Sequence, residues 1–212
     1  FCDMFLDMHF TSSHKIDVSA ITPLQQKHIP SLSDLPKIYF EKGKNQLHKF
    51  IMIKLNGGLG TSMGCKGPKS LIRVTNNDTF FDIINKQYIY DQKVYQTSFP
   101  IYFMNSFNTD QETKSALNTT KMKSFLQDRI PRLVASTKLP FEADHSSSAW
   151  CPPGHGNVFL SLLNRGILEH AMNKGQEYAF ISNSDNLGAT LDLSILGYMV
   201  EKKSPFLMEV TP

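Results

Sequence analysis

Residues 54–70 read Lys-Leu-Asn-Gly-Gly-Leu-Gly-Thr-Ser-Met-Gly-Cys-Lys-Gly-Pro-Lys-Ser and directly follow the apolar run Phe-Ile-Met-Ile at 50–53. The apolar run predicts a buried strand that ends in a loop. Glycines at positions 57, 58, 60 and 64 allow the backbone of that loop to approach a ligand closely and to adopt positive φ angles. Consecutive N–H groups in such a loop can bind an anion, and Lys66 and Lys69 add positive charge. The stretch therefore predicts a cradle for a phosphorylated ligand.

Two common phosphate-binding patterns do not fit this stretch. A Walker loop requires Gly-x-x-x-x-Gly-Lys followed by Ser or Thr, whereas Lys69 and Ser70 follow Pro68. The dinucleotide fingerprint Gly-x-Gly-x-x-Gly begins correctly at Gly58 and Gly60, but its third glycine position holds Met63. A structural glycine turn with solvated lysines is the other interpretation. The preceding strand and the paired lysines favour the ligand loop over it.

The rest of the chain alternates short apolar runs with segments of helical periodicity. Strands are predicted at 50–55, 70–74, 100–104, 123–126, 178–181 and 206–210. Helices are predicted at 1–15, 38–48, 80–96, 110–118, 152–174 and 192–202, with Asp110 as the cap of the fourth. The prolines within 16–37 predict an extended linker. Strands that alternate with helices predict an α/β fold with a mixed, mostly parallel sheet flanked by helices.

The predicted sheet also indicates where a ligand would bind. Parallel sheets bind ligands beyond the carboxyl ends of their strands. The loops after the strands at 50–55, 100–104, 123–126 and 178–181 are therefore expected to converge on one cleft.

Composition and the chain ends narrow the class of protein. A net charge of +3 and the lack of a long uncharged apolar run argue against a nucleic-acid or membrane partner. The three cysteines lack metal-ligand spacing and are odd in number, which predicts a reducing, cytoplasmic environment. The chain begins with Phe1 instead of Met and ends directly after the apolar run at 206–210, which predicts a fragment with an incomplete catalytic domain.

Residues 54–70 closely resemble the signature loop of the eukaryotic UTP–glucose-1-phosphate uridylyltransferases, also called UDP-glucose pyrophosphorylases. The resemblance runs from about residue 20 to 212 and is strongest at 54–72, 104–113, 150–156 and 178–192. It implies a Rossmann-like nucleotidyltransferase fold of the GT-A type. Residues 1–49 would then be a helical and extended segment that packs on the catalytic domain, and 50–212 the N-terminal part of that domain. A further phosphate-binding lysine and a C-terminal β-helix domain would lie beyond residue 212.

The resemblance also implies a reaction and a set of site residues. UTP and glucose 1-phosphate would give UDP-glucose and pyrophosphate by in-line attack on the α-phosphate. Lys69 would be the catalytic cation, with Lys66 supporting the loop electrostatically, and Asp185 would bind Mg²⁺ as cofactor. His155 and Asn183 would bind the substrate. The nucleotide would contact Leu55, Asn56, Gly57, Gly58, Gly60, Thr61, Met104, Gln127 and Gly154.

Residue chemistry alone leaves other interpretations open for these positions. A carboxamide such as that of Gln127 can pair with one acceptor and one donor of uracil, but a lone glutamine is usually solvated. His155 follows a proline-glycine turn and could equally cap a helix. Asp185 stands among asparagines that form turns, although a carboxylate at a strand end beside a phosphate loop is typical of Mg²⁺ sites.

Two other functions remain compatible with the sequence. One is a related pyrophosphorylase for another UDP-sugar or for UDP-N-acetylhexosamine, because part of the sugar site would lie beyond residue 212. The other is a truncated, catalytically inactive nucleotide-binding protein. The presence of Lys69, Gln127 and Asp185 argues against the second.

Overall fold

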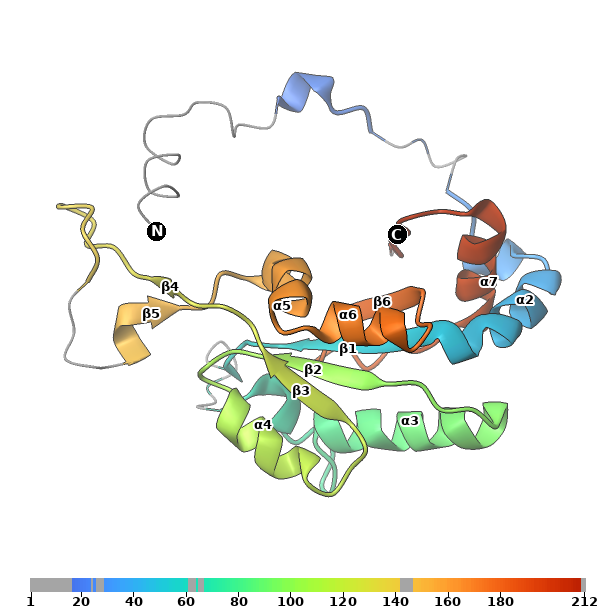
Figure 1. The fold of residues 1–212 in the computed structure, drawn as a ribbon, viewed down its shortest axis with the longest axis horizontal. Helices are drawn as coiled ribbons and strands as arrows, with labels where there is room; N and C mark the ends of the chain where they lie inside the picture. Colours follow the sequence, from blue (N-terminus) through green and yellow to red (C-terminus); the bar gives the residue numbers. More distant parts are fainter. Residues whose placement is uncertain are drawn as a thin grey trace. The chain divides into compact units, whose positions relative to one another are not determined.

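The computed structural model describes residues 17–23, 25, 29–60, 64, 67–141 and 147–210 (Figure 1). The chain divides into two compact units, Phe1–Leu35 and Pro36–Pro212. The described part of the first unit holds two short 3₁₀ turns, η2 (Val18–Ala20) and η4 (Leu32–Asp34). The helix predicted at 1–15 lies outside the described residues.

A four-stranded parallel sheet forms the centre of the second unit. Its order is β3 (Lys123–Leu126), β2 (Ile101–Asn105), β1 (Phe50–Asn56) and β6 (Tyr178–Asn183). Strand β1 is buried along almost its whole length, as expected for a strand covered on both faces. The strands predicted at 50–55, 100–104, 123–126 and 178–181 and the α/β class are confirmed.

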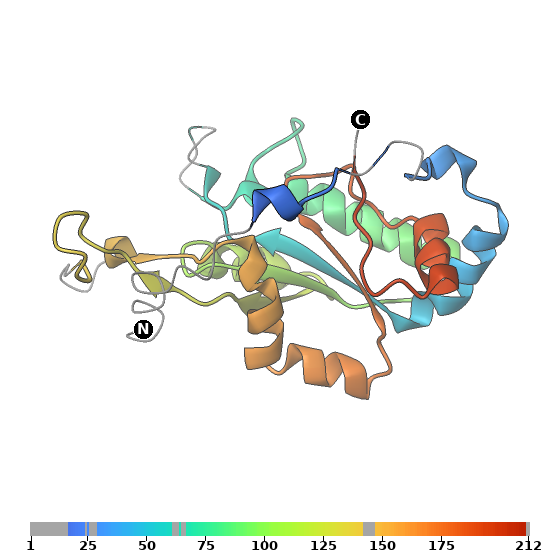
Figure 2. The same ribbon diagram turned by 90° about the horizontal axis from the view of Figure 1, so that it is seen from above.

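Helices cover both faces of this sheet (Figures 1 and 2). Because successive strand residues point to opposite faces, β1 contributes Phe50 and Met52 to one core cluster and Ile51 and Ile53 to the other. The first cluster includes residues of α3 (Phe80–Tyr95), α4 (Asp110–Leu117) and α7 (Leu193–Lys202). The second includes residues of α5 (Val158–Asn164) and α6 (Ile167–Asn173).

Helix α2 (Ile38–Gln46), which continues into η5 (Leu47–Lys49), packs against α7 at unusually short range (Figure 2). A Cβ atom added to Gly43 would lie 1.9 Å from the Leu193 carbonyl oxygen. One added to Gly197 would lie 1.8 Å from the Tyr39 carbonyl oxygen. Helix α2 therefore belongs to the same compact unit as the sheet.

Several predicted elements differ in the structure. Residues 70–74 are not a strand, because Leu71 N–H bonds back to the Pro68 carbonyl in the 3₁₀ turn η7 (Lys69–Leu71). The helix predicted over 152–174 is two helices, separated at Gly166, which has a φ of 67°. Residues 206–210 form no strand and pair with none in the described part of the chain. Asp110 is the first residue of α4, and Thr109 precedes it as the N-cap residue.

A short antiparallel pair, β4 (Ile130–Pro131) with β5 (Trp150–Cys151), was not predicted. It brings the chain back from β3 toward η9 (His155–Asn157) and α5. No helix in the described residues is long and apolar enough to cross a membrane.

Candidate functional site

The loops at the carboxyl end of the sheet are joined by the side chain of Asn56, which is 1% exposed. Its Nδ2 donates to Asn105 Oδ1 at 2.8 Å and to Thr113 Oγ1 at 2.9 Å. Its Oδ1 accepts a hydrogen bond from Ser184 Oγ at 3.0 Å. One buried amide thus ties the ends of β1 and β2 to α4 and to the loop after β6. Asn56 is occupied by protein partners, so it positions the loop and does not offer its side chain to a ligand.

The loop after β3 reaches the same place through Gln127. Its backbone N–H donates to the Asn105 carbonyl at 2.8 Å, and its side chain lies against Gly57, where an added Cβ would be 2.1 Å from Gln127 Nε2. The four loops therefore meet at this end of the sheet, as predicted. Residue 57 must be glycine for Gln127 to occupy this position.

Two buried side-chain atoms in the described part of the chain lack a hydrogen-bond partner, namely Gln127 Oε1 and Ser70 Oγ. Leaving a buried polar atom unpaired costs roughly 1–3 kcal/mol, so such atoms are rare in the absence of a ligand. Both residues belong to the loops that carry the predicted site. Gln127, 6% exposed, is therefore not the solvated glutamine of the alternative interpretation.

The glycine loop closes on itself at its base. Gly60 N–H donates to the Gly67 carbonyl at 3.0 Å, and Lys69 N–H donates to the Gly58 carbonyl at 3.3 Å. The Gly57 carbonyl accepts a hydrogen bond from Ser106 Oγ at 2.8 Å. Gly64 has a φ of 72°, in the left-handed region that favours glycine. Thr61 and Lys66 lie outside the described residues.

Lys69 and Asp185 form an ion pair next to the glycine loop. Lys69 Nζ lies 2.9 Å from Asp185 Oδ2, and the two side chains are 31% and 25% exposed. Asp185 stands in the turn after β6, and Lys69 in η7 after the glycine loop. The structure therefore brings the predicted catalytic cation and the predicted metal ligand into direct contact.

The donor set limits the kind of metal that could bind here. Among the described residues, no group of three or more His, Cys, Asp or Glu side chains could hold a metal ion by itself. Mg²⁺ commonly uses one or two carboxylates and takes its other ligands from substrate phosphates and water. A single carboxylate at Asp185 fits a Mg²⁺ ion that arrives with a nucleotide.

Leu55 and Asn183 are register partners on adjacent strands. Leu55 packs against the second core cluster, and its carbonyl accepts the Ser184 N–H at 3.0 Å. Asn183 is exposed at the end of β6, where it can reach a ligand. Met104 is completely buried within the second core cluster. The enclosed Met104 side chain does not support the expected contact with uracil.

A chain of hydrogen bonds connects the turn of Gly154 and His155 to the loop of Gln127. Asn157 N–H donates to the Gly154 carbonyl, and the Asn157 side chain bonds the backbone and carboxylate of Asp128, next to Gln127. Gly154 has a φ of 106° and precedes η9, and both it and His155 are exposed.

Lys54 was not predicted as a site residue. It lies in the middle of the sheet, is 2% exposed, and donates to Ser182 Oγ and to the Ala189 carbonyl, both at 2.9 Å. No ion pair joins it to a carboxylate in the described part of the chain, and burial lowers the pKa of Lys54 to about 8. The signal in the sequence was a lysine at the end of an apolar strand, between Ile53 and Leu55.

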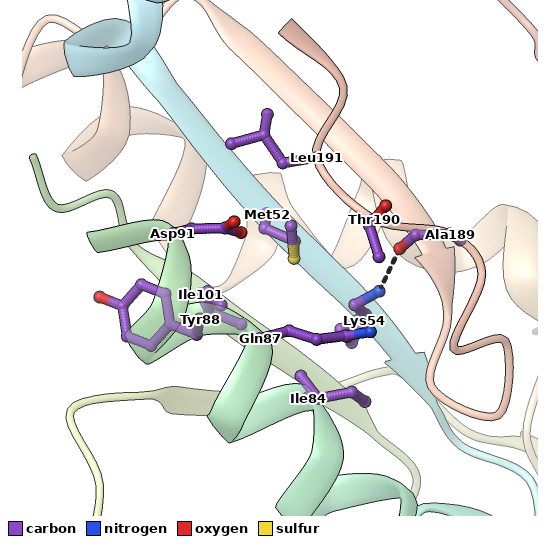
Figure 3. A pocket seen from close by; sticks show the side chains of 10 residues that line it. All are labelled: Met52, Lys54, Ile84, Gln87, Tyr88, Asp91, Ile101, Ala189, Thr190 and Leu191. Carbon is purple, nitrogen blue, oxygen red and sulfur yellow. Dashed lines mark hydrogen bonds between the residues drawn. The ribbon is translucent and has the colours of Figure 1, made fainter. Parts of the chain in front are cut away.

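Lys54 lines a small cavity between the sheet, α3 and the segment before α7 (Figure 3). Burial also raises the pKa of Asp91, another lining residue, to about 6. The cavity is lined by Met52, Lys54, Ile84, Gln87, Tyr88, Asp91, Ile101, Ala189, Thr190 and Leu191.

Comparison with known sequences gives one consistent result. The family model described as UTP–glucose-1-phosphate uridylyltransferase matches residues 1–212. UTP–glucose-1-phosphate uridylyltransferase 2 of Dictyostelium discoideum is 43% identical over 203 residues, covering 92% of this chain and 40% of that protein. The Saccharomyces cerevisiae protein named UTP–glucose-1-phosphate uridylyltransferase is 40% identical over 221 residues, covering 97% of this chain and 44% of that protein.

Solved structures agree with the sequence matches. UDP-glucose pyrophosphorylase from Leishmania major superposes with a TM-score of 0.81 at 31% identity, covering 95% of this chain and 43% of that one. A mutant of that protein in complex with UDP-glucose has a TM-score of 0.77 at 33% identity, covering 88% of this chain and 40% of that one. The chain spans less than half the length of these relatives.

Proposed function

The chain belongs to the UTP–glucose-1-phosphate uridylyltransferase family, and we propose that the protein makes UDP-glucose and pyrophosphate from UTP and glucose 1-phosphate. The observation that carries the proposal is the convergence of four strand ends on Gln127, the glycine loop and the Lys69–Asp185 pair. A base-reading amide and a phosphate-binding cation then lie on one edge of the sheet. This is the edge at which parallel sheets bind nucleotides.

Gln127 would recognise the base. Its Oε1 is buried and unpaired among the described residues, so an N–H donor of the ligand would satisfy it. The imide N–H of uracil is such a donor, and an adjacent uracil carbonyl would accept from Nε2. Cytosine has an acceptor where uracil has the N–H, so two acceptors would meet and the site would reject it.

The loop and Lys69 would bind the phosphates. A phosphate oxygen of glucose 1-phosphate attacks the α-phosphorus of UTP, and the bond from that phosphorus to the departing pyrophosphate breaks. The attacking oxygen carries no proton at neutral pH, so His155 acts as a hydrogen-bond donor and not as a general base. Catalysis then consists of positioning and charge neutralisation, which loop N–H groups and the Lys69 ammonium supply.

Asp185 would hold a Mg²⁺ ion together with the nucleotide phosphates. The ion, when bound, supplies positive charge that neutralises the phosphate oxygens. Lys69 and Asp185 neutralise each other in this structure. Binding of the nucleotide would separate this pair, because the Lys69 ammonium gains a phosphate partner and the Asp185 carboxylate becomes available. Asn183, exposed beside Asp185, would contact hydroxyl groups of the sugar.

We also place the reaction in the cytoplasm. The support is the odd number of cysteines without metal or paired spacing, which suits a reducing compartment. Detection of the native protein in a secreted or membrane fraction would contradict this.

The direct test is UDP-glucose formation by the native protein, with glucose 1-phosphate, galactose 1-phosphate and N-acetylglucosamine 1-phosphate compared at equal concentration. We expect glucose 1-phosphate to give the highest kcat/KM, and Lys69→Met to lower kcat by about 10²- to 10³-fold, the effect of losing one charge-stabilising donor. A preference for another sugar phosphate would assign a related pyrophosphorylase. UTP binding without turnover of any of them would assign a nucleotide-binding protein and overturn the proposal.

A further inference from the structure

The loop that carries Asp185 is held at both ends by one buried lysine. We define the Asp185 loop as residues 183–190, which begin with the last residue of β6 and end shortly before α7. Lys54 Nζ donates to Ser182 Oγ, directly before this loop, and to the Ala189 carbonyl near its end. Both distances are 2.9 Å. A single ammonium group thus fixes the separation of the two ends.

A second donor from another element holds the same loop. Gln87 Nε2, on α3, donates to the Leu187 carbonyl at 3.1 Å. In Figure 3, Gln87 and Lys54 extend toward the same corner of the cavity, beside Ala189. The returning half of the Asp185 loop is therefore fixed from β1 and from α3.

Burial of the Lys54 ammonium group costs free energy because the charge loses its contact with water. In the described part of the chain it has a hydroxyl and a carbonyl as hydrogen-bond partners and no carboxylate, with the Phe180 ring 5.8 Å from its Nζ. Isolated buried charge is unfavourable, and an apolar side chain of similar length would fill the same space without that cost. A requirement to hold the Asp185 loop accounts for the lysine.

The held segment leads directly to the site. Within the loop, Ser184 Oγ bonds the buried Asn56 amide, and Asp185 Oδ2 lies 2.9 Å from Lys69 Nζ. A shift of the Leu187 and Ala189 carbonyls would move Asp185 relative to Lys69.

We propose that Lys54 and Gln87 are positioning residues that place the Asp185 carboxylate opposite Lys69 by holding the Ala189 and Leu187 carbonyls. The consequence for Mg²⁺ rests on the proposed function, but the mechanical role does not. Neither residue touches the reacting groups.

The test uses hydrogen exchange of the ligand-free native protein and its Mg²⁺ dependence. Several amides of the Asp185 loop are hydrogen-bonded, at residues 184, 186, 188, 189 and 190, so their exchange reports loop opening. We expect exchange of these amides to be roughly tenfold faster in Lys54→Met and several-fold faster in Gln87→Leu. The Mg²⁺ concentration for half-maximal activity should rise by about tenfold in Lys54→Met.

Ile84→Val is the matched control. Ile84 lines the same cavity and is 2% exposed, but its side chain has no polar group to bond the loop. If the effects came from a general loosening of the core, this variant would show them as well. If Lys54 and Gln87 act as positioning residues, Ile84→Val changes neither the exchange of the loop amides nor the Mg²⁺ dependence.

Unchanged exchange and unchanged Mg²⁺ dependence in both polar variants would overturn the positioning role. If Lys54→Met does not fold, Gln87→Leu decides the question by the same measurements. Faster loop exchange in a protein that transfers no uridylyl group would support the positioning role and refute the proposed function. Full uridylyl-transfer activity together with unchanged loop exchange in both variants would support the proposed function and refute the positioning role.

Discussion

At the scale of single residues, the proposed site depends on one buried amide oxygen, Gln127 Oε1, that lacks a hydrogen-bond partner in the described part of the chain. Gln127 Oε1 is unpaired among the described residues, while Gln127 Nε2 lies where a side chain at position 57 would be. A protein accepts such an arrangement when a ligand completes it. The chemistry of Gln127 was foreseeable from the sequence as a hypothesis, but its burial depends on contacts between two distant loops.

The Gln127→Leu variant tests base recognition. It keeps the approximate shape and removes both hydrogen-bonding groups, so we expect kcat/KM for UTP to fall by about 10²-fold, the effect of losing two buried hydrogen bonds. Steady-state kinetics with UTP and CTP measures this, and the preference for UTP should shrink. Gln111→Leu, at an exposed position on α4, is the matched control and should match the unmodified protein.

Gly57→Ala should reproduce the same loss while residue 127 remains glutamine. The added Cβ would displace the flexible end of the Gln127 side chain and no backbone atom of it. The double variant should then be no worse than either single variant, because both remove one interaction. Additive losses would show that Gly57 acts independently of Gln127.

The buried Lys54 predicts an unusual dependence of stability on pH. Its pKa is about 8 in the folded protein against 10.5 ordinarily, so between these values the unfolded chain binds more protons than the folded one. Stability should therefore rise with pH across this window, by roughly 3 kcal/mol from this residue. Urea unfolding at pH 8 and pH 10 measures it, and Lys54→Met should lack the rise. Equal pH dependence of the two proteins would contradict the pKa.

At the scale of elements, the strand pattern was readable because β1 and β2 are nearly continuous apolar runs that end in polar loops. The failures have local causes. Residues 70–74 resemble a strand in composition. However, the segment begins in the turn after Pro68 and Val74 is exposed, so it does not pair with the sheet. The break at Gly166 and the contact between α2 and α7 depend on tertiary packing, which periodicity does not reveal.

The close contact of α2 with α7 predicts that neither glycine at its centre tolerates a side chain. Gly197→Ala would place Cβ 1.8 Å from a backbone oxygen, so the helices must separate. We expect the free energy of unfolding to fall by about 1–3 kcal/mol, despite the better helix propensity of alanine. Chemical denaturation measures this. Lys44→Ala, at an exposed position on α2, is the control, and a Gly197→Ala protein as stable as the control would refute the packing.

At the scale of the whole molecule, the described chain leaves apolar surface uncovered. Phe159, Leu160, Leu163 and Met172, on α5 and α6, are 58–65% exposed, and strand β6 pairs with β1 and with no further strand in the described residues. The chain spans about 40% of the relatives it matches.

This exposed face predicts the behaviour of residues 1–212 when expressed alone. Clustered apolar side chains at this exposure promote association, so we expect the isolated chain to bind an apolar dye and to self-associate. Size-exclusion chromatography with light scattering measures the mass in solution. Replacing Phe159 and Leu163 by serine should restore a monomer, and a strictly monomeric unmodified chain would contradict this reading of the face.

The most direct test of the account is a crystal structure of the native protein with UDP-glucose and Mg²⁺. We predict that the uracil edge lies within hydrogen-bonding distance of Gln127, about 3 Å. We also expect Lys69 and Asp185 to have moved apart, with Lys69 on the phosphates. A base bound away from Gln127, or a Lys69–Asp185 pair that stays closed with the nucleotide in place, would contradict it.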